Sequence, residues 1–254
     1  MRHVAVTGAG GAVGRETLDA LDEYSVRPIT HRDHEDIDSI VLELEDEAAL
    51  VEAFEGCDVV VHLAADASVT ASWESARDVN IHGTYNVFEA ARKAGIERVV
   101  FGSSNHVTHM YNMSDPADPG TTEPDPEVVS PEDPFRPSSY YGVSKLAGEG
   151  LGSLYADRHG LTVVNLRIGY LQDRETLVSH QADSPDRARQ TRAMFLSPRD
   201  YRQAIRQAVD APIAENPLTV NLVSRNDDRY HTITEAVRGL GYRPRDNSAE
   251  LLEE

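Results

Sequence analysis

The chain has 254 residues, 40% of them hydrophobic, which is enough to build the core of one large domain. Acidic residues number 43 against 24 basic ones, and the formal net charge of -19 disfavours binding to nucleic acid or to anionic membranes. The carboxylates are scattered and Arg far exceeds Lys, which predicts a halophilic protein; an ordinary acidic mesophilic protein is the alternative.

Cysteine usage and hydropathy indicate a cytoplasmic protein. The single cysteine, Cys57, excludes an internal disulfide and a cysteine-based metal site. No apolar run approaches the roughly 20 residues of a membrane span. The chain starts directly in a predicted strand, so no signal peptide is expected.

The N-terminal segment combines a short β-rich run, a glycine turn and a helix. Residues 2–7 predict the strand and residues 15–21 the helix. This order is typical of dinucleotide-binding folds, because glycines let the backbone approach a pyrophosphate and the helix N-terminus offers free N–H groups. The predicted cofactor-binding residues of this turn are Gly8, Gly10, Gly11, Ala12, Val13 and Gly14.

The end of the second predicted strand, residues 26–30, bears on the choice of cofactor. A fold that prefers NAD places an acidic residue there to bind the ribose hydroxyls, whereas an Arg accommodates the 2′-phosphate of NADP. Here His31 and Arg32 follow the strand, and Asp33 comes two positions late. We therefore expect NADP as the preferred cofactor, with NAD as the alternative.

Strands and helices continue to alternate, which predicts an α/β fold with a doubly wound parallel sheet, the Rossmann architecture. Ligands of such sheets lie at the carboxyl ends of the strands. Residues 1–170 are assigned to the dinucleotide-binding core, and residues 171–254 to a small C-terminal substrate cap of the same domain. The further predicted strands are 40–44, 58–65, 98–101, 161–168 and 218–223; the helices are 47–54, 78–94, 141–155, 198–209 and 232–240; residues 115–137 and most of 171–195 are predicted loops.

A tyrosine and a lysine four residues apart, Tyr141 and Lys145, share one face of a predicted helix. An ammonium beside a phenol lowers the phenol pKa from its ordinary value of about 10, which suits a general base for an alcohol proton. Ser104, at the end of a strand, offers a hydroxyl for the same substrate oxygen. An amphipathic helix that carries Tyr and Lys by chance is the alternative for this pair alone.

Together these residues resemble the extended short-chain dehydrogenase/reductase family across nearly the full chain. The residues that carry this resemblance are the glycine turn, His62 to Ala65, Asn80, Ser104 and Tyr141 to Lys145. A closer resemblance is to sugar 1-dehydrogenases of the uronate dehydrogenase and archaeal glucose-6-phosphate dehydrogenase type. It rests on residues 101–106, 166–169, 194–200 and 241–250.

The resemblance implies oxidation of the anomeric carbon of an aldose to a lactone, without a metal. It makes Tyr141 the proton acceptor, Lys145 the lysine that lowers its pKa and holds the nicotinamide ribose, and Asn80 a support of the proton relay. The implied sugar ligands are Ser68, Ser104, Asn105, His106, Tyr141, Tyr170 and Gln190. The further implied cofactor ligands are Glu43, Leu44, Leu63, Ala64, Ala65, Asn80, Tyr141, Lys145 and Ile168.

One departure from the resemblance bears on the substrate. Relatives that act on anionic sugars carry an Arg where this chain has Gln190, and an amide cannot make the forked ionic contact of a guanidinium. Arg189 and Arg192 flank the position and could restore the charge. The sequence therefore predicts a neutral aldose, such as L-arabinose or another pentose or hexose.

Other functions remain as alternatives. They are a dehydrogenase of glucose 6-phosphate or a hexuronate, a nucleotide-sugar epimerase or dehydratase, a non-enzymatic nucleotide sensor and a structural protein. The segment after residue 171 is short for a nucleotide-sugar site, and sensors usually lose the Tyr and Lys pair. By analogy alone we expect a homo-oligomer, such as a dimer that pairs through the helices of Asn80 and Tyr141.

Overall fold

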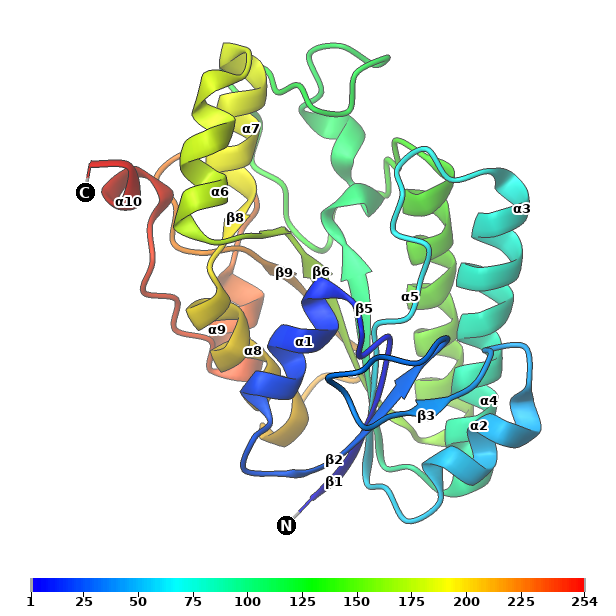
Figure 1. The fold of residues 1–254 in the computed structure, drawn as a ribbon. Helices are drawn as coiled ribbons and strands as arrows, with labels where there is room; N and C mark the ends of the chain where they lie inside the picture. The colour runs from blue at the N-terminus through cyan, green and yellow to red at the C-terminus, as the bar shows by residue number, and fades with distance from the viewer. Residues whose placement is uncertain (1, 254) are drawn as a thin grey trace.

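The framework of the protein is a seven-stranded parallel sheet (Figure 1). The computed structural model describes residues 2–253. The strand order is β3-β2-β1-β4-β5-β6-β9, and all neighbouring strands are parallel. Successive strands are added on one side of β1 up to β3 and on its other side from β4 onward. Doubly wound sheets bind their ligands at this switch between β1 and β4. The strands are β1 (His3–Thr7), β2 (Ser25–Thr30), β3 (Ile40–Val41), β4 (Val59–His62), β5 (Arg98–Ser104), β6 (Thr162–Ile168) and β9 (Leu218–Leu222). The predicted doubly wound fold is confirmed.

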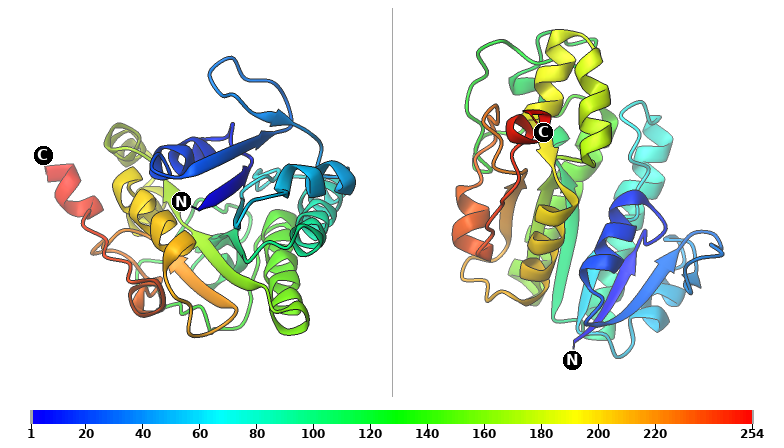
Figure 2. Two further views of the ribbon diagram at one scale, coloured as in Figure 1. Left: turned by 90° about the horizontal axis from the view of Figure 1, so that it is seen from below. Right: turned by 60° about the vertical axis from the view of Figure 1, so that its left-hand side comes forward.

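Helices cover both faces of the sheet, with α1, α8 and α9 on one face and α2, α4 and α5 on the other (Figures 1 and 2). The helices α6 and α7 lie beyond the carboxyl ends of β5 and β6. The helices are α1 (Ala12–Ala20), α2 (Glu47–Phe54), α3 (Trp73–Ser75), α4 (Gly83–Ala94), α5 (Tyr140–His159), α6 (Arg174–Ser179), α7 (Pro185–Met194), α8 (Pro198–Asp210), α9 (Thr234–Leu240) and α10 (Ser248–Glu253). A second, two-stranded sheet pairs β7 (Tyr170–Leu171) with β8 (Phe195–Leu196).

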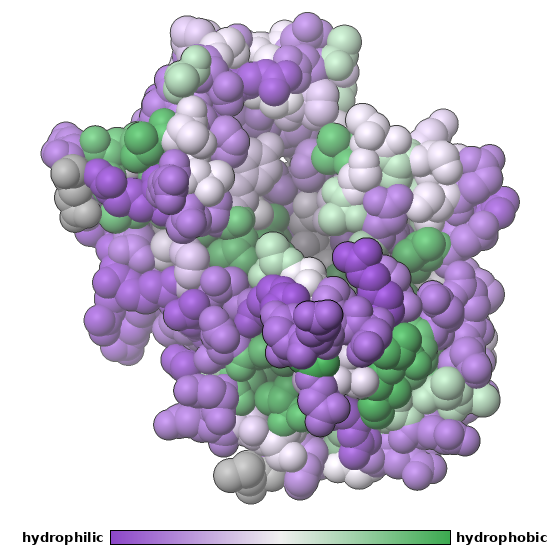
Figure 3. All heavy atoms as spheres, in the orientation of Figure 1, coloured by the Kyte–Doolittle hydropathy of each residue, from purple (hydrophilic) through white to green (hydrophobic). Residues whose placement is uncertain are grey.

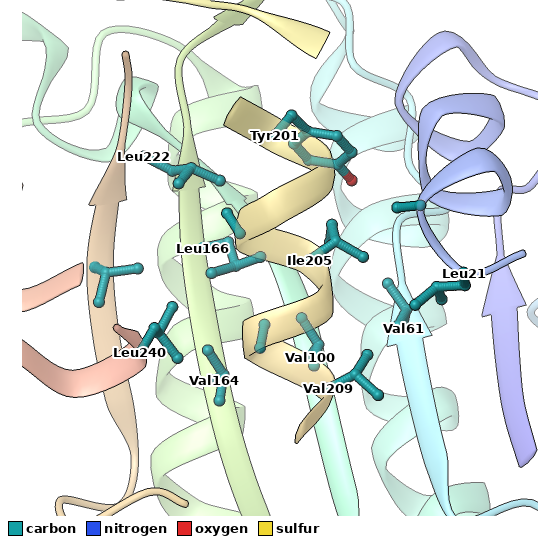
Figure 4. Close-up of a cluster of buried hydrophobic side chains, with 14 of the residues drawn as sticks. Leu21, Val61, Val100, Val164, Leu166, Tyr201, Ile205, Val209, Leu222 and Leu240 are labelled. Carbon is teal, nitrogen blue, oxygen red and sulfur yellow. The ribbon is translucent and has the colours of Figure 1, made fainter. Parts of the chain in front are cut away.

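The central strands are apolar on both faces because helices cover both. On the α8 face, Ile205 and Tyr201 of α8 pack over Val100 and Leu166 of β5 and β6 (Figure 4). All four side chains are fully buried. Each buried aliphatic side chain contributes about 1.5–3 kcal/mol, so this layer fixes the strands whose upper ends carry the site.

One buried cation ties the lower end of β5 to α8. The Arg98 guanidinium donates to the carbonyl oxygens of Ala208, Val209 and Ala211 at 2.9, 2.6 and 2.9 Å. These carbonyls at the end of α8 have no partner within the helix, and a positive charge there also matches the negative end of the helix dipole.

Several predicted boundaries are wrong. The third strand ends at Val41 rather than Leu44, and the helix predicted from Asp78 is preceded by α3 and runs through a π-helical stretch, Ala76–His82. Residues 171–195, predicted as mainly a solvated loop, form β7, α6 and α7, and α10 was not predicted. The predicted start of α8 is correct, since the Ser197 hydroxyl accepts the Asp200 N–H at 3.1 Å.

Hydrophilic residues predominate on the face shown in Figure 3, and the surface is hollowed near its middle. Within residues 2–253, none of the helices combines the length and apolar character that crossing a bilayer requires.

Candidate active site

The glycine turn between β1 and α1 leaves a bare helix N-terminus. Gly8 has a φ of +73°, and a Cβ there would lie 2.6 Å from the Ala64 nitrogen. A Cβ on Gly14 would lie 2.2 Å from the Gly8 oxygen, which allows α1 to start against the turn. Gly11 precedes α1 without a side-chain cap, and a Cβ there would meet only the Gly8 oxygen at 3.5 Å. The Gly11 N–H donates to the Gly8 oxygen at 3.1 Å, so the groups open to an anion are the N–H groups of the first turn of α1.

A cleft of about 600 Å³ lies beside this turn. The predicted cofactor residues that line it are Gly8, Gly11, Ala12, Val13, Gly14, His31, Glu43, Leu44, Leu63, Ala64 and Ala65. Lining residues that the sequence analysis did not identify are Thr7, Ile29, Thr30, Leu42, Glu45, Asp66, Ala67 and Val79. Thr7, Ile29, Thr30 and Leu42 lie within predicted strands, and Glu45, Asp66 and Ala67 follow a predicted strand by one or two positions. That proximity to the strand ends is the signal that could have found them.

Six predicted cofactor residues are absent from the cleft lining: Gly10, Arg32, Asn80, Tyr141, Lys145 and Ile168. Gly10 packs under the His34 ring, since a Cβ on Gly10 would lie 2.2 Å from His34 Nε2. Arg32 is exposed next to His31, and Ile168 ends β6.

A buried histidine joins β1, β4 and α4 under the cleft. His62 Nδ1 lies 2.7 Å from Thr7 Oγ1, and its Nε2 lies 3.0 Å from Thr84 Oγ1. Burial lowers the His62 pKa to about 3, so the ring is neutral at physiological pH. The N–H groups of Leu63 and Ala64 also donate to Thr7 Oγ1, each at 3.3 Å. These bonds hold the end of β4 against the glycine turn.

The predicted catalytic residues meet where β5 ends and α5 begins. Ser104 ends β5, and Tyr141 lies in the first turn of α5, whose N-cap Ser139 accepts the Gly142 N–H at 3.2 Å. Lys145 follows one turn later, with its Nζ 5.6 Å from the centre of the Tyr141 ring. The structure therefore brings Ser104, Tyr141 and Lys145 together as the sequence predicts.

The electrostatics of the pair differ from the prediction. Burial raises the pKa of Tyr141 above its ordinary value, and the Ser104 hydroxyl only partly opposes this. Burial also lowers the pKa of Lys145 to about 8. The expected lowering of the Tyr141 pKa is wrong for the protein alone, because desolvation of the phenolate outweighs the favourable hydrogen bond from Ser104.

Lys145 is only 4% exposed, and its ammonium forms no hydrogen bond or ion pair with another residue of the described chain. Its nearest aromatic neighbour is Phe101, whose ring centre lies 5.1 Å from Nζ. A buried ammonium without an acceptor is costly, so this geometry fits a group that brings oxygen acceptors into the cleft.

Asn80 connects the loop after β4 with α5. Its Nδ2 donates to the backbone carbonyl oxygen of Asp66 at 2.9 Å and to Ser144 Oγ at 3.0 Å. Its Oδ1 accepts the Asp66 backbone N–H at 2.8 Å. It lies in the π-helical stretch Ala76–His82, a feature often found at functional sites. Asn80 thus positions α5 through Ser144.

Of the predicted sugar ligands, Asn105 and His106 adjoin the catalytic group. The His106 N–H donates to Ser104 Oγ at 3.2 Å, and the His106 ring centre lies 5.7 Å from that of Tyr141. Asn105 Nδ2 is buried without a partner in the described chain. These groups can hold hydroxyls of a small molecule beside Tyr141.

The other predicted sugar ligands lie further out. Ser68 is exposed in the loop after β4, where its hydroxyl lies 2.9 Å from Thr70 Oγ1. Tyr170 lies in β7. Gln190 is buried in α7, and its Nε2 donates to His109 Nε2 and, at 3.0 Å, to the Pro119 carbonyl. Gln190 therefore reaches the site through His109, which the sequence analysis did not identify.

The arginines that flank Gln190 are engaged elsewhere. The Arg189 guanidinium donates to the backbone carbonyl oxygen of Thr122 at 2.7 Å and lies 3.3 Å from the Asp186 carboxylate. The Arg192 guanidinium lies 2.6 Å from the Asp228 carboxylate. A third arginine of α7, Arg187, lies 2.8 Å from Asp118. Each arginine of α7 is thus paired with a carboxylate.

The chain is similar to known proteins over its full length. Residues 4–172 match the family described as NAD dependent epimerase/dehydratase. The chain belongs to this family. It is 54% identical over 254 residues to the L-arabinose 1-dehydrogenase (NAD(P)(+)) of Haloferax volcanii, with 100% of both chains covered. It is 36% identical over 266 residues to the NAD-dependent glucose-6-phosphate dehydrogenase of the same organism, with 98% of this chain and 95% of the relative covered.

Solved structures agree with this assignment to the epimerase/dehydratase family. The uronate dehydrogenase of Agrobacterium tumefaciens matches with a TM-score of 0.81 and 29% identity, covering 100% of this chain and 88% of that one. A mutated uronate dehydrogenase matches with a TM-score of 0.82 and 31% identity, covering 99% and 84%. The predicted resemblance to extended short-chain dehydrogenases and to sugar 1-dehydrogenases is confirmed.

The residues present fit the nicotinamide dinucleotide that the family name implies. The N–H groups of Ala12 and Val13, in the uncapped first turn of α1, suit the pyrophosphate. The Lys145 ammonium, which has no acceptor among residues 2–253, suits ribose hydroxyls.

Proposed function

We propose that this chain is an NAD(P)-dependent sugar 1-dehydrogenase that oxidises the anomeric carbon of a neutral aldose to the lactone. The observation that carries the proposal is the convergence of Ser104, Tyr141 and Lys145 beside the dinucleotide cleft. The similarity to an L-arabinose 1-dehydrogenase supports an aldose, with L-arabinose, another pentose or a hexose as candidates.

The nicotinamide, when bound, accepts the hydride that leaves C1 of the sugar. In the proposed mechanism Ser104 holds the C1 hydroxyl and Tyr141 takes its proton. The Lys145 ammonium offsets the negative charge that forms on the Tyr141 oxygen, and a buried charge acts strongly there because little water screens it. Asn80 keeps α5 in place through Ser144.

For the cofactor we propose NADP as the preferred molecule and NAD as the alternative. His31 lines the cleft at the end of β2 and Arg32 follows it, so the two positions after this strand carry no carboxylate that would repel a 2′-phosphate. The related L-arabinose 1-dehydrogenase carries NAD(P)(+) in its name.

The preference for a neutral sugar rests on the charges around Tyr141. Burial lowers the pKa of His106 to about 4 and that of His109 to about 3, so both rings are neutral at physiological pH. The arginines of α7 are paired with carboxylates. Burying a sugar carboxylate or phosphate without a cation is costly, whereas hydroxyls find donors and acceptors in imidazole and amide groups.

Three further features belong to the proposal. The segment 171–254 supplies a substrate cap through β7, α6 and α7, which stand over the carboxyl ends of the central strands (Figure 1). The protein is cytoplasmic and halophilic, as its net charge of -19 and its Haloferax relative suggest. It forms a homo-oligomer, with a dimer through the Asn80 and Tyr141 helices as the first candidate.

A panel of sugars tests the proposal. Purified protein in molar KCl is assayed with NADP and with NAD against L-arabinose, other pentoses, glucose, glucuronate and glucose 6-phosphate, and the lactone is trapped with hydroxylamine. We expect a neutral aldose to have the highest kcat/KM. A higher value for a sugar acid or a sugar phosphate would refute the neutral substrate, and inactivity on the whole panel would refute the dehydrogenase.

A further inference from the structure

We propose that Gln190, His109 and Ser138 form a hydrogen-bond relay that fixes His106 as its Nε2–H tautomer beside Tyr141. The relay makes Gln190, His109 and Ser138 positioning residues, and it gives His106 a fixed donor for a sugar oxygen. The role of that donor rests on the proposed function, whereas the relay itself rests on the geometry alone.

The first link of the relay is the orientation of the Gln190 amide. Its Nε2 lies 3.0 Å from the Pro119 carbonyl oxygen and also contacts His109 Nε2. A carbonyl oxygen only accepts hydrogen bonds, so the amide must turn its NH₂ group toward Pro119. The flipped amide would place two oxygens against each other. The same NH₂ group therefore faces His109.

The second link is the tautomer of His109. Because the Gln190 NH₂ only donates, His109 Nε2 must accept and carry no proton. Burial keeps the ring neutral, with a pKa of about 3, so its single proton lies on Nδ1. His109 Nδ1 lies 3.0 Å from Ser138 Oγ and donates to it. This Nδ1–H form is the less common tautomer of free histidine.

The third link passes through the Ser138 hydroxyl to His106. Ser138 Oγ accepts from His109, which leaves its own proton to donate. Its other partner is His106 Nδ1, at 3.3 Å. Because Ser138 Oγ contacts no other acceptor within residues 2–253, the relay directs its proton to His106 Nδ1. The proton of this neutral ring then lies on Nε2, which makes no hydrogen bond within the same residues.

The relay ends at the reacting group. The His106 and His109 rings lie 4.4 Å apart, centre to centre, and the His106 ring meets the Tyr141 ring edge-on at 5.7 Å. A neutral donor at His106 Nε2 favours an oxygen with a free lone pair, which every sugar hydroxyl offers. In the Nδ1–H tautomer of His106, Nε2 would be an acceptor, and the sugar hydroxyl would have to donate its proton to it.

Histidine ¹⁵N NMR of the wild-type apoprotein at neutral pH tests the relay without substrate. The chain has ten histidines, and His106→Asn and His109→Asn assign two of them by loss of signals. We expect His109 as Nδ1–H and His106 as Nε2–H. Either residue found mainly in the opposite tautomer would overturn the proposal.

Gln190→Met tests the coupling, because Met has a similar length but no donor. We expect His109 to shift to Nε2–H, the Ser138 hydroxyl to turn toward His109, and His106 to lose its pure Nε2–H form. Ser138→Ala should free His106 in the same way, and Ser138→Thr, which keeps a hydroxyl, should restore it. A change confined to His109 in Gln190→Met, or no change in either variant, would refute a continuous relay.

Kinetics link the relay to the sugar. A lost hydrogen bond to the substrate should raise KM for the preferred aldose by roughly tenfold in Gln190→Met and Ser138→Ala, while KM for NADP stays constant. Ser138→Thr should recover the wild-type value. Unchanged sugar KM in variants with altered tautomers would refute the role of His106 as a donor. Inactivity of the wild type on all aldoses would instead refute the proposed function and leave the NMR result standing.

Discussion

The buried ammonium of Lys145 yields the sharpest test of the site. Burial lowers its pKa from the ordinary 10.5 to about 8, and no partner in the described chain compensates. The folded protein thus binds this proton less tightly than the unfolded chain by a pKa difference of about 2.5. At 1.36 kcal/mol for each pKa unit, the buried charge lowers the free energy of unfolding of the apoprotein by roughly 3 kcal/mol at neutral pH.

The pH dependence follows from the same values. Below pH 8 both the folded and the unfolded chain carry the charge, and the full destabilisation is present. Between pH 8 and 10.5 the folded protein loses the proton first, so its free energy of unfolding rises with pH as far as Lys145 is concerned. Above pH 10.5 the effect vanishes.

Lys145→Met removes the charge and keeps an unbranched apolar chain. We expect the variant to exceed the wild type in free energy of unfolding by roughly 3 kcal/mol at pH 7, and the gain to shrink as pH approaches 10.5. Urea denaturation of the apoproteins at several pH values in one KCl concentration measures this difference. Dehydrogenase activity of the variant should be lost at every pH.

Lys93 provides a matched control, because Lys93 and Lys145 are the only two lysines of the chain. Lys93 is partly exposed and pairs with Glu47, which raises its pKa. Lysine labelled with ¹³C at Cε gives two signals, and we expect midpoints of about 8 for Lys145 and above 10.5 for Lys93. An ordinary midpoint for Lys145, or a variant that gains nothing at pH 7, would refute the reasoning.

Three further outcomes are expected. Tyr141→Phe keeps the ring but removes the proton acceptor, so the rate should fall by about 10²–10⁴-fold with cofactor affinity nearly unchanged; wild-type turnover would exclude the assignment. His31→Asp should lower the kcat/KM ratio of NADP to NAD, because a carboxylate repels the 2′-phosphate; a wild type that already prefers NAD strongly would point to Asp33 instead. The melting temperature should be higher in molar KCl than in dilute buffer, since salt screens the repulsion within a net charge of -19; a salt-independent value would contradict the halophilic character.

The parts of the fold that the sequence predicts are those in which burial and periodicity agree. Val59–His62 and Arg98–Ser104 are buried along their whole length, and their apolar runs stand out from the acidic surroundings. The glycine turn is predictable because only glycine adopts the conformation of Gly8 without strain. The convergence of Ser104 and Tyr141 follows from the parallel topology, which brings strand ends to one edge.

The helix α7 was missed because its buried face mixes polar and apolar residues. Gln190 and Thr191 are buried beside Ala188, Ala193 and Met194, so the hydrophobic period of an ordinary amphipathic helix is weak. A helix-start signal was nevertheless present, since Ser184 and Pro185 begin α7 as Ser197 and Pro198 begin α8. Capping residues locate such a helix when hydropathy does not.

The pKa values of Tyr141 and Lys145 could not be predicted from their spacing. The spacing places both groups on one face of α5, but the direction of each shift depends on burial, which raises one pKa and lowers the other. Burial in turn depends on residues far away in the chain, such as Phe101 beneath the Lys145 ammonium. A local motif therefore predicts which groups meet, and the tertiary structure decides their protonation.

The cofactor side of the site carries a buried positive charge, whereas the sugar side is lined by neutral groups. On the cofactor side, Lys145 is a cation without an acceptor among residues 2–253, so a ligand that brings oxygen atoms is stabilised there. On the sugar side, His106 and His109 are kept neutral by burial, and their partners are a hydroxyl and an amide. Neutral donors and acceptors bind hydroxyls at little desolvation cost, whereas a carboxylate placed among them would remain uncompensated. An enzyme with this division should bind a charged dinucleotide and an uncharged sugar, and converting it to an anionic substrate would require a new cation as well as room for it.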